Sequence, residues 1–565
     1  MKTIKSMKWW GWGDANIEFD IDSRPALWPY LMKEIKLKEL PEKIRVVNKE
    51  TIILPKAKEN AAFINSLTET LQAEQIKSDD QTRLAHTYGK SFRDLWRIRN
   101  SDIKRAPDCV VYPYSNQDVS NILRLAHQHN VVIIPFGGGT NIVGGVESLA
   151  SEQRMIVVVS LRAIDEVIVN HDNMTAKIGA GILGPALEKK LNAEHVTLGH
   201  FPDSFEYSSL GGWVATRSAG MLSDHYGKIE DMVFALTMIT PSGEIITREV
   251  PKASNGIDIK QLCIGSEGVL GIITEITMMV HPLPKYKAYY GFLFHDFTSG
   301  VEAVNHVIKK GVKPTMMRLS DAKKTQLSFV FKKRGKFTQR LLSRVTKWYL
   351  KKIKKIDLDT CCLMLIGCEA QDKKTFARQY NKVAKLFKQH HAIALGASPG
   401  RSFAKSKYDF PYTRDHLMDY GIVVDVSETA TVWNNVLPLY HQTMDNIRQA
   451  IQKLDCEPWV GCHLSHSYHS GASLYFTFGF LPKHQDKVIE QYWQVKQAAE
   501  QSFIDGGATL SHHHAVGYEH APWIADDIGN TGVDIVDTLK QKLDPNNIMN
   551  PGKYIRSQHD NYTKL

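Results

Sequence analysis

The sequence predicts an α+β protein with two main domains, and two observations lead to this prediction. Short β-rich segments alternate with amphipathic helical segments from residue 103 onwards. Three glycine-rich, hydroxyl-rich loops recur within residues 103–284, and residues 285–500 continue the alternation. We therefore expect a loop-rich first domain, followed by a second domain that shapes a substrate site.

The composition is that of an ordinary globular protein. Of the 565 residues, 43% are hydrophobic and 23% are charged, which excludes a disordered chain, a collagen and a small disulfide-stapled scaffold. The seven cysteines are an odd number without Cys-x-x-Cys spacing, so we expect reduced thiols in a cytoplasmic compartment. No uncharged apolar run approaches the roughly 18 residues that a membrane-spanning helix requires.

The net charge of +10 has a local origin. Residues 332–355 contain 11 basic residues and no acidic residue, and Leu341, Val345 and Trp348 recur there at helical spacing. This pattern predicts an interfacial helix on an anionic membrane surface. The alternative is a surface helix with a solvated basic face, which base rates favour equally. Nucleic acid is not expected as a partner, because no binding motif accompanies the charge.

The elements of the first domain follow in order after a mixed, helix-leaning region at 1–102. Asn116 is a candidate N-cap, and apolar residues at helical spacing continue the helix to about residue 129. A buried strand is expected at 131–135. Further strands are expected at residues 155–161, 174–179, 232–240, 244–250 and 268–281. Pro282 and Pro284 end the last of these strands.

The second domain is expected at residues 285–500, where Val301, Val304 and Ile308 mark one face of a helix. The final segment contains Ser511 followed by three histidines, and it closes on Asp-Pro and Asn-Pro-Gly-Lys between residues 544 and 553. The expected domain boundaries are therefore 1–102, 103–284, 285–500 and 501–565.

The first glycine-rich loop has the sequence Phe-Gly-Gly-Gly-Thr-Asn at residues 136–141, directly after a buried strand. Consecutive residues without a Cβ let backbone N–H groups converge on a phosphate. The loop is neither the dinucleotide fingerprint Gly-x-Gly-x-x-Gly nor a P-loop. Taken alone, it indicates a tight turn as often as a phosphate site.

Two further loops, at 202–220 and 265–274, accompany the first, together with the segment 226–231 and the closing Asn-Pro-Gly-Lys. Together these segments resemble the FAD-binding domain of the vanillyl-alcohol oxidase and p-cresol methylhydroxylase superfamily. The resemblance implies a two-subdomain FAD-binding domain with an α+β cap domain. It also implies non-covalent FAD, because loop 135–141 has no histidine or cysteine where covalent relatives attach the flavin.

The flavin contacts that this resemblance implies lie in four short segments. They are Pro135, Phe136, Gly137, Gly138, Gly139, Thr140 and Asn141; Asp203, Ser204, Ser208 and Ser209; Thr216, Arg217, Ser218 and Ala219; and Glu267, Gly268, Val269, Leu270, Gly271, Ile272 and Ile273.

Within that superfamily, the sequence is similar to the alkyldihydroxyacetonephosphate synthase family over nearly its whole length. The similar segments include residues 8–13, 318–321, 411–415 and 471–476. The resemblance implies exchange of the acyl chain of acyl-dihydroxyacetone phosphate for a long-chain fatty alcohol, which starts an ether lipid, without net redox. It further implies a homodimer whose residues 501–565 complete the active site.

The same resemblance places Tyr475, Arg318, Arg414 and the histidines His512, His513 and His514 in the active site. Tyr475 would take a proton with the help of a histidine. Arg414 would hold the phosphate, because a guanidinium forks onto phosphate oxygens. Arg318 would hold either the leaving carboxylate or the edge of the flavin. The histidines would transfer protons and donate hydrogen bonds, without individual assignments.

Ordinary structural roles compete with these assignments. A tyrosine in an alternating strand is usually a packed core residue, and arginines are usually surface charges. Three adjacent histidines suggest a metal site, but consecutive side chains on a strand alternate between its faces. Only His512 and His514 would then share one side, so we expect no metal.

Two other functions compete with the synthase activity. The first is an FAD-dependent 2-hydroxy-acid dehydrogenase or oxidase of the same superfamily, since fold does not determine function. Such enzymes often carry a His-x-Gly-Asp-Gly-Asn-x-His-like metal segment, whereas residues 469–475 lack its acidic and second histidine positions. The second is a lipid-surface module without activity, with 332–355 as its functional element.

The expected location follows from the substrates. Long-chain substrates are held in membranes, so a cytoplasmic protein resting on the inner face of a membrane through 332–355 could admit them directly. The last three residues, Thr-Lys-Leu, differ by one substitution from the peroxisomal signal Ser-Lys-Leu. A peroxisomal location is therefore a minor alternative.

Overall fold

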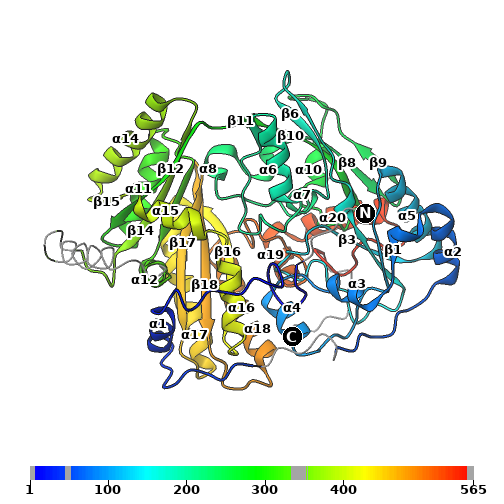
Figure 1. The fold of residues 1–565 in the computed structure, drawn as a ribbon, viewed down its shortest axis with the longest axis horizontal. Coiled ribbons are helices and arrows are strands. Elements are labelled where there is room, and N and C mark those ends of the chain that lie inside the picture. The colour runs from blue at the N-terminus through cyan, green and yellow to red at the C-terminus, as the bar shows by residue number, and fades with distance from the viewer. Residues whose placement is uncertain (1–6, 45–51, 332–351, 353, 355, 556–565) are drawn as a thin grey trace.

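Two lobes lie side by side in the computed structural model, which describes residues 7–44, 52–331, 352, 354 and 356–555. In Figure 1 the strands from β1 to β11 belong to one lobe, and those from β12 to β18 belong to the other. The predicted interfacial helix at 332–355 lies outside the described residues, apart from Lys352 and Lys354. None of the described helices has the combination of length and apolar character that a bilayer crossing requires.

The N-terminal region ties the lobes together. Its described helices are α1 (Leu27–Glu34), α2 (Ala61–Thr70), α3 (Asp80–Ala85) and α4 (Phe92–Arg99). Before α1, the chain is bonded to α16 (Phe410–Met418) of the second lobe. Trp12 donates its backbone N–H to Asp415, and Arg24 pairs with Asp409 at 2.7 Å. Phe92 on α4 enters the core of the same lobe.

The first sheet of the first lobe has four strands in the order β1 (Ile76–Lys77), β2 (Cys109–Val111), β4 (Ile156–Ser160) and β3 (Val132–Phe136). The last three are parallel, and their buried positions are apolar apart from Ser160, which is typical of a sheet covered on both faces. Helix α5 (Asn116–His129) connects β2 to β3 as predicted. Ser115 caps it rather than Asn116, because Ser115 has the extended backbone that lets its hydroxyl accept from the N–H of Asp118.

The second sheet of this lobe is antiparallel. Its order is β5 (Val167–Asn170), β6 (Thr175–Gly179), β10 (Ile272–Met279), β8 (Val233–Thr240) and β9 (Gly243–Ile246). The strand predicted at 244–250 stops at Ile246, since β9 is an edge strand whose residues are largely exposed. The strand predicted from 268 begins at Ile272, because Gly268 has a φ of +76° and turns the chain.

The second lobe is built on a seven-stranded antiparallel sheet. Its order is β15 (Ile393–Gly396), β12 (Tyr286–Phe294), β14 (Cys362–Ala370), β13 (Met316–Ser320), β17 (Trp459–Ser467), β18 (Gly471–Phe480) and β16 (Val423–Val432). Helices α11 (Phe297–Lys309), α14 (Lys373–Gln389), α17 (Val436–Lys453) and α18 (Val488–Asp505) pack on it through one large core. Val301 and Val304 are buried on α11, as the predicted helix face requires.

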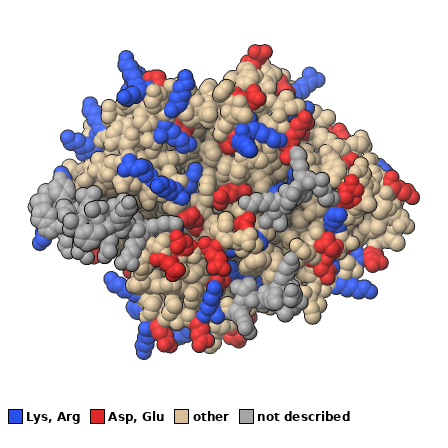
Figure 2. Space-filling model, in the orientation of Figure 1, with Lys and Arg blue, Asp and Glu red and all other residues tan. Residues whose placement is uncertain are grey.

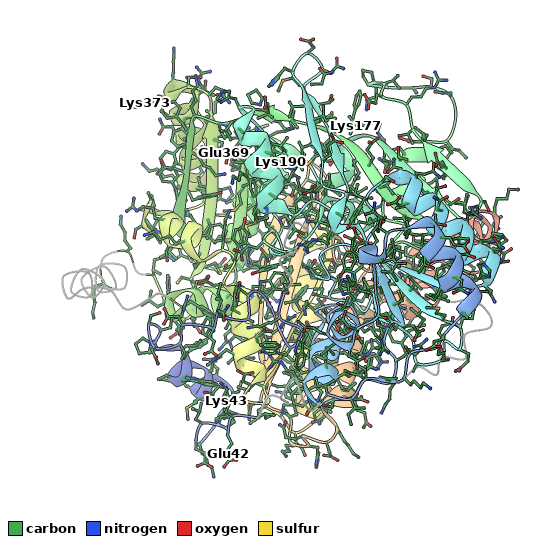
Figure 3. All side chains as sticks on the ribbon, turned by 45° about the vertical axis from the view of Figure 1, so that its right-hand side comes forward. Glu42, Lys43, Lys177, Lys190, Glu369 and Lys373 are labelled. Atoms are coloured by element: carbon green, nitrogen blue, oxygen red, sulfur yellow. The ribbon has the colours of Figure 1, made fainter. Side chains whose placement is uncertain are left out.

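Shorter elements complete the two lobes. They are α6 (Gly184–Ala193), β7 (Val196–Thr197), α7 (Leu210–Ala215), α8 (Ser223–Tyr226), α9 (Ile229–Met232), α10 (Ile259–Cys263), β11 (His281–Pro282), α12 (Ala322–Val330), α15 (Ser398–Ser406), α19 (Ile524–Ile528) and α20 (Asn530–Leu543). The lobes meet at several polar contacts, one of which joins Tyr226 of α8 to Glu369 of β14 at 2.8 Å (Glu369 is labelled in Figure 3).

The C-terminal segment returns to the first lobe. Ile133 of β3 donates its backbone N–H to the carbonyl of Ile548 at 2.8 Å, and its carbonyl accepts from Asn550 at 2.8 Å. Asp544 accepts from the N–H groups of Ile548 and Met549, which fixes the turn after α20. The closing Asp-Pro sequence therefore anchors the tail beside the first sheet.

Candidate active site

A cavity lies between the two lobes, with the glycine-rich loops on one side and strands β13, β17 and β18 and helix α16 on the other. Most of the residues predicted to contact a flavin line this cavity: Pro135, Phe136, Gly137, Gly138, Gly139, Thr140, Asn141, Asp203, Ser204, Ser208, Ser209, Thr216, Ser218, Ala219, Glu267, Gly268, Gly271, Ile272 and Ile273. Arg318, Arg414, Tyr475, His513 and His514 line it from the opposite side.

The glycines of the first loop are required by the close approach of the second lining segment, residues 203–209. A Cβ at Gly138 would lie 1.9 Å from the carbonyl oxygen of Tyr207, and one at Gly137 would lie 2.1 Å from Oγ of Ser209. Only backbone fits between the two segments, so the cavity wall there consists of peptide groups and serine hydroxyls. Such a wall fits the pyrophosphate of a dinucleotide, which backbone N–H groups and hydroxyls bind.

Three predicted flavin contacts are directed elsewhere. Arg217 has a φ of +49° and donates to the carbonyl and side chain of Gln261 at 2.9 and 3.2 Å. Val269 and Leu270 are buried in the core of the first lobe. The side chains of these three residues therefore do not line the cavity, and their contact with a flavin stays a prediction.

Tyr475 occupies the middle of β18, with its ring among imidazoles. In the ladder it lies opposite His463 of β17, and the two rings stack with centroids 4.7 Å apart and an angle of 27°. The ring of His514 lies edge-on at 5.3 Å. Burial raises the pKa of Tyr475 well above its usual value, so the phenol is protonated at neutral pH.

The three histidines do not form a strand, which corrects the prediction that they alternate between two faces. They bend around the buried carboxylate of Glu428 on β16. Oε1 of Glu428 accepts from the backbone N–H groups of His512, His513 and His514 at 2.9 to 3.0 Å and from the hydroxyl of Ser511 at 2.8 Å. All three histidines are consequently held on the same side of one carboxylate.

The side chains of this cluster differ in their contacts. Nδ1 of His513 lies 3.1 Å from Glu428, whereas His512 turns away from the cavity and bonds through Nε2 to the hydroxyl of Tyr468 at 2.5 Å. Burial would raise the pKa of Glu428, but the neighbouring His513 lowers it well below its usual value. Burial lowers the pKa values of His512 and His514 well below 6.5, so these two rings are neutral at pH 7.

Ligand atoms of Glu428, His513 and His514 lie within 4.8 Å of one another, a spacing that a metal ion can use. The set differs from the pair of His512 and His514 that the sequence pattern allowed. Glu428 already accepts hydrogen bonds from three backbone N–H groups and a hydroxyl, so its carboxylate has a structural role without any ion.

Arg414 presents free hydrogen-bonding capacity to the cavity. Its Nη1 donates to the carbonyl of Lys90 at 2.7 Å, while Nε and Nη2 are buried and have no hydrogen-bond partner in the described part of the chain. Nη2 lies 3.6 Å from Asp415, too far for a hydrogen bond. The Nε and Nη2 edge of a guanidinium is a bidentate site for an oxyanion. Lys90 lines the same wall, and burial lowers its pKa to about 8.

A second, apolar cavity adjoins the first and shares Phe410, Arg414 and Val424 with it. The remaining wall consists almost entirely of apolar residues: Leu27, Leu31, Ile35, Leu327, Phe331, Leu417, Ile422, Trp459 and Gly479, with Thr413 and Thr477. Helix α1 of the N-terminal region therefore contributes to an apolar space that Arg414 also lines.

Sequence reasoning missed four residues of this site, namely Lys90, Glu428, His463 and His466. The last two line the cavity from β17. One signal was present in the sequence, because His463 and Ser465 alternate on a segment that precedes the Tyr475 strand by a short turn. Lys90 and Glu428 carry no local signal, since only tertiary contacts bring Lys90 to the cavity and Glu428 to the three histidines.

Comparison with known proteins agrees with this architecture. Residues 107–248 match the model of an FAD binding domain, and residues 283–554 match that of the C-terminal domain of FAD linked oxidases. The chain is similar to p-cresol methylhydroxylase in fold alone, with a TM-score of 0.66 at 12% identity over 87% of this chain and 96% of that one. The predicted fold class is thus confirmed.

Two closer similarities cover nearly the whole chain. The chain is 38% identical to alkyldihydroxyacetonephosphate synthase of Dictyostelium discoideum, over 98% of this chain and 94% of that one. A solved alkyldihydroxyacetonephosphate synthase structure superposes with a TM-score of 0.83 at 36% identity, covering 97% of this chain and 98% of that one. The chain belongs to the FAD-dependent alkyldihydroxyacetonephosphate synthase family.

Proposed function

We propose that the protein exchanges the acyl chain of acyl-dihydroxyacetone phosphate for a long-chain fatty alcohol, which yields the alkyl ether and a free fatty acid. One observation carries the proposal. The cavity places flavin-type loops, the Tyr475 phenol and the free guanidinium edge of Arg414 together, beside an apolar cavity. These are a cofactor site, a proton-transfer group, a phosphate site and a hydrocarbon site for one phosphorylated lipid.

Arg414 is proposed to bind the phosphate through Nε and Nη2, the two nitrogens that have no hydrogen-bond partner among the described residues. Lys90 adds a second positive charge on the same wall. Arg318, on β13, is proposed to hold either the leaving carboxylate or the flavin edge. The apolar cavity beside Arg414 would then receive the hydrocarbon chain, since burial of each CH₂ contributes about 0.8 kcal/mol.

Tyr475 is proposed to accept the proton that leaves the carbon beside the ketone of the substrate. A phenol whose pKa is raised cannot act as a base by itself, so a neutral imidazole must accept its proton. His463 and His514 are both neutral and both contact the ring, which qualifies either as the acceptor. A flavin bound at the glycine-rich loops supplies a reversible electron sink, so that the exchange involves no net redox. We propose non-covalent binding, because residues 135–141 contain no histidine or cysteine.

The test is to incubate the purified, flavin-loaded protein with palmitoyl-dihydroxyacetone phosphate and hexadecanol without an electron acceptor. Mass spectrometry should find the hexadecyl ether and palmitate in equal amounts. Tyr475→Phe and Arg414→Ala should abolish the product while retaining the flavin. A flavin-loaded wild type without product would contradict the proposal and favour a redox enzyme, which flavin bleaching by 2-hydroxy acids would reveal.

We also propose a peripheral location at a membrane, in the cytoplasm rather than in peroxisomes, and a homodimer. The basic segment 332–355 supports membrane contact through its charge. Figure 2 shows further lysines and arginines gathered over α14, whose exposed basic residues include Lys373, Arg378 and Lys385. Flotation with anionic vesicles tests the membrane contact, and a protein that stays off the vesicles would contradict it. Analytical ultracentrifugation tests the homodimer, and a monomer would contradict it.

A further inference from the structure

A β-bulge directs His466 into the cavity. The ladder between β17 and β18 shifts its register between Ser465 and Ser467, so His466 is the extra residue. Its φ is 51°, in the left-handed region that residues with a Cβ rarely adopt. Such strain persists only where the surroundings hold it in place, and bulges next to active sites re-aim a side chain. The side chain of His466 lines the cavity.

Two consecutive residues of α8 hold the bulge and the imidazole. Asp224 accepts hydrogen bonds from the backbone N–H groups of Ser467 at 2.6 Å and Met317 at 2.7 Å. Ser223 places its Oγ 2.6 Å from Nδ1 of His466. The backbone of the bulge is therefore fixed through Asp224, and the orientation of the ring is fixed through Ser223.

The ring of His466 is neutral. Burial, assisted by the neighbouring His513 and Lys228, lowers the pKa of His466 well below its usual value. When the hydroxyl of Ser223 donates to Nδ1, the single proton of the neutral ring is on Nε2. Within the described part of the chain, no hydrogen bond from a protein group reaches this Nε2.

A neutral imidazole N–H in an active site is a fixed donor that can polarise a carbonyl. We infer that His466 donates a hydrogen bond from Nε2 to the ketone oxygen of the dihydroxyacetone phosphate group, with Ser223 as the positioning residue that sets its tautomer. The inference rests on the proposed function, which requires a proton to leave the carbon beside this ketone. A hydrogen bond to the ketone oxygen makes that C–H group more acidic.

Isotope-edited infrared spectroscopy tests the inference on the flavin-loaded protein with dihydroxyacetone phosphate labelled at its carbonyl carbon. In the wild type, the ketone band should move to lower frequency on binding. His466→Phe should abolish this shift, Ser223→Ala should reduce it, and Ser223→Thr, which keeps the hydroxyl, should restore it. With the full substrates, kcat of His466→Phe should fall about 100-fold with little change in KM.

The exposed His469, three residues further along, provides the matched control, since His469→Phe should leave the shift unchanged. An unshifted band in the wild type, or no binding of dihydroxyacetone phosphate, overturns the inference. The inference is also overturned if the ketone band of both Ser223→Ala and His466→Phe shifts on binding by as much as it does in the wild type. Ser223→Ala keeps the Asp224 contacts, so the test holds if His466→Phe does not fold. Failure of the proposed function can be distinguished from failure of this inference. The first appears as the absence of ether product, independently of the frequency of the ketone band.

Discussion

Replacing Glu428 by glutamine should lower the free energy of unfolding by about 3 kcal/mol. Glutamine has nearly the same shape, and its amide oxygen can still accept the backbone N–H groups of His512, His513 and His514. A hydrogen bond to a charged acceptor contributes roughly 1 kcal/mol more than one to a neutral acceptor. Three weakened bonds therefore account for the predicted loss.

Urea titration of the flavin-loaded protein, followed by tryptophan fluorescence, measures this difference. The matched control is Glu275→Gln on β10, whose partner Lys177 is half exposed and lies 2.9 Å away (Lys177 is labelled in Figure 3). A surface ion pair contributes about 0–1 kcal/mol, so the control should change little. A loss in Glu428→Gln no larger than in Glu275→Gln would refute the reasoning.

The pH dependence provides a second check on Glu428. Its pKa in the folded protein is depressed below the unfolded value of 4.5, so the ionised form stabilises the fold. The difference between wild type and Glu428→Gln should be complete above pH 4.5 and should shrink as the pH falls towards the folded pKa. A difference that grows on acidification would contradict the assignment of a charged carboxylate.

Three further predictions concern substrate and membrane binding. Arg414→Lys should raise KM for palmitoyl-dihydroxyacetone phosphate about 10- to 100-fold by losing bidentate contact, and an equal rise in KM for hexadecanol would contradict a phosphate site. Because burial lowers the pKa of Lys90 to about 8, this KM should rise above pH 8 as the ammonium loses its proton. Lys90→Arg should remove the inflection from the KM profile, and a flat wild-type profile from pH 7 to 10 would exclude the role. Deleting 332–355 should abolish binding to anionic liposomes with flavin content unchanged, and undiminished binding would exclude this segment as the membrane contact.

Local sequence patterns predicted helix α5 and strands β3, β4, β6, β8, β9 and β10 of the first lobe within a few residues, and missed shorter elements such as β5. Nearly continuous apolar runs indicated buried strands such as β4 and β8, and these runs reflect burial on both faces. The end of β9 was misplaced, because β9 lies at the edge of its sheet. The length of an edge strand depends on its pairing with the neighbouring strand, which the local sequence does not show. The N-cap of α5 is Ser115, one residue before the predicted Asn116, and the sequence did not separate them because both residue types are good caps.

Residues of the candidate active site were predicted only from the family resemblance and from the composition of the glycine-rich loops. Glu428 and His512 are 84 positions apart, and no local pattern shows that the carboxylate bends the three histidines around itself. The strand assumed for the histidines was wrong for that reason. His466 enters the cavity through a bulge, and an alternating pattern alone does not show where an extra residue interrupts the ladder.

The bonds between the N-terminal segment and α16 affect how the chain acquires its fold. Trp12 and Asp415 are 403 positions apart, so their hydrogen bond cannot form until most of the chain has been synthesised. Contacts of such high sequence separation slow folding, and they leave early segments without partners during synthesis. Arg414 adjoins Asp415 on the same helix, so the guanidinium proposed to bind phosphate gains its final position only when the first residues dock. Completion of the substrate site would therefore be a late folding event.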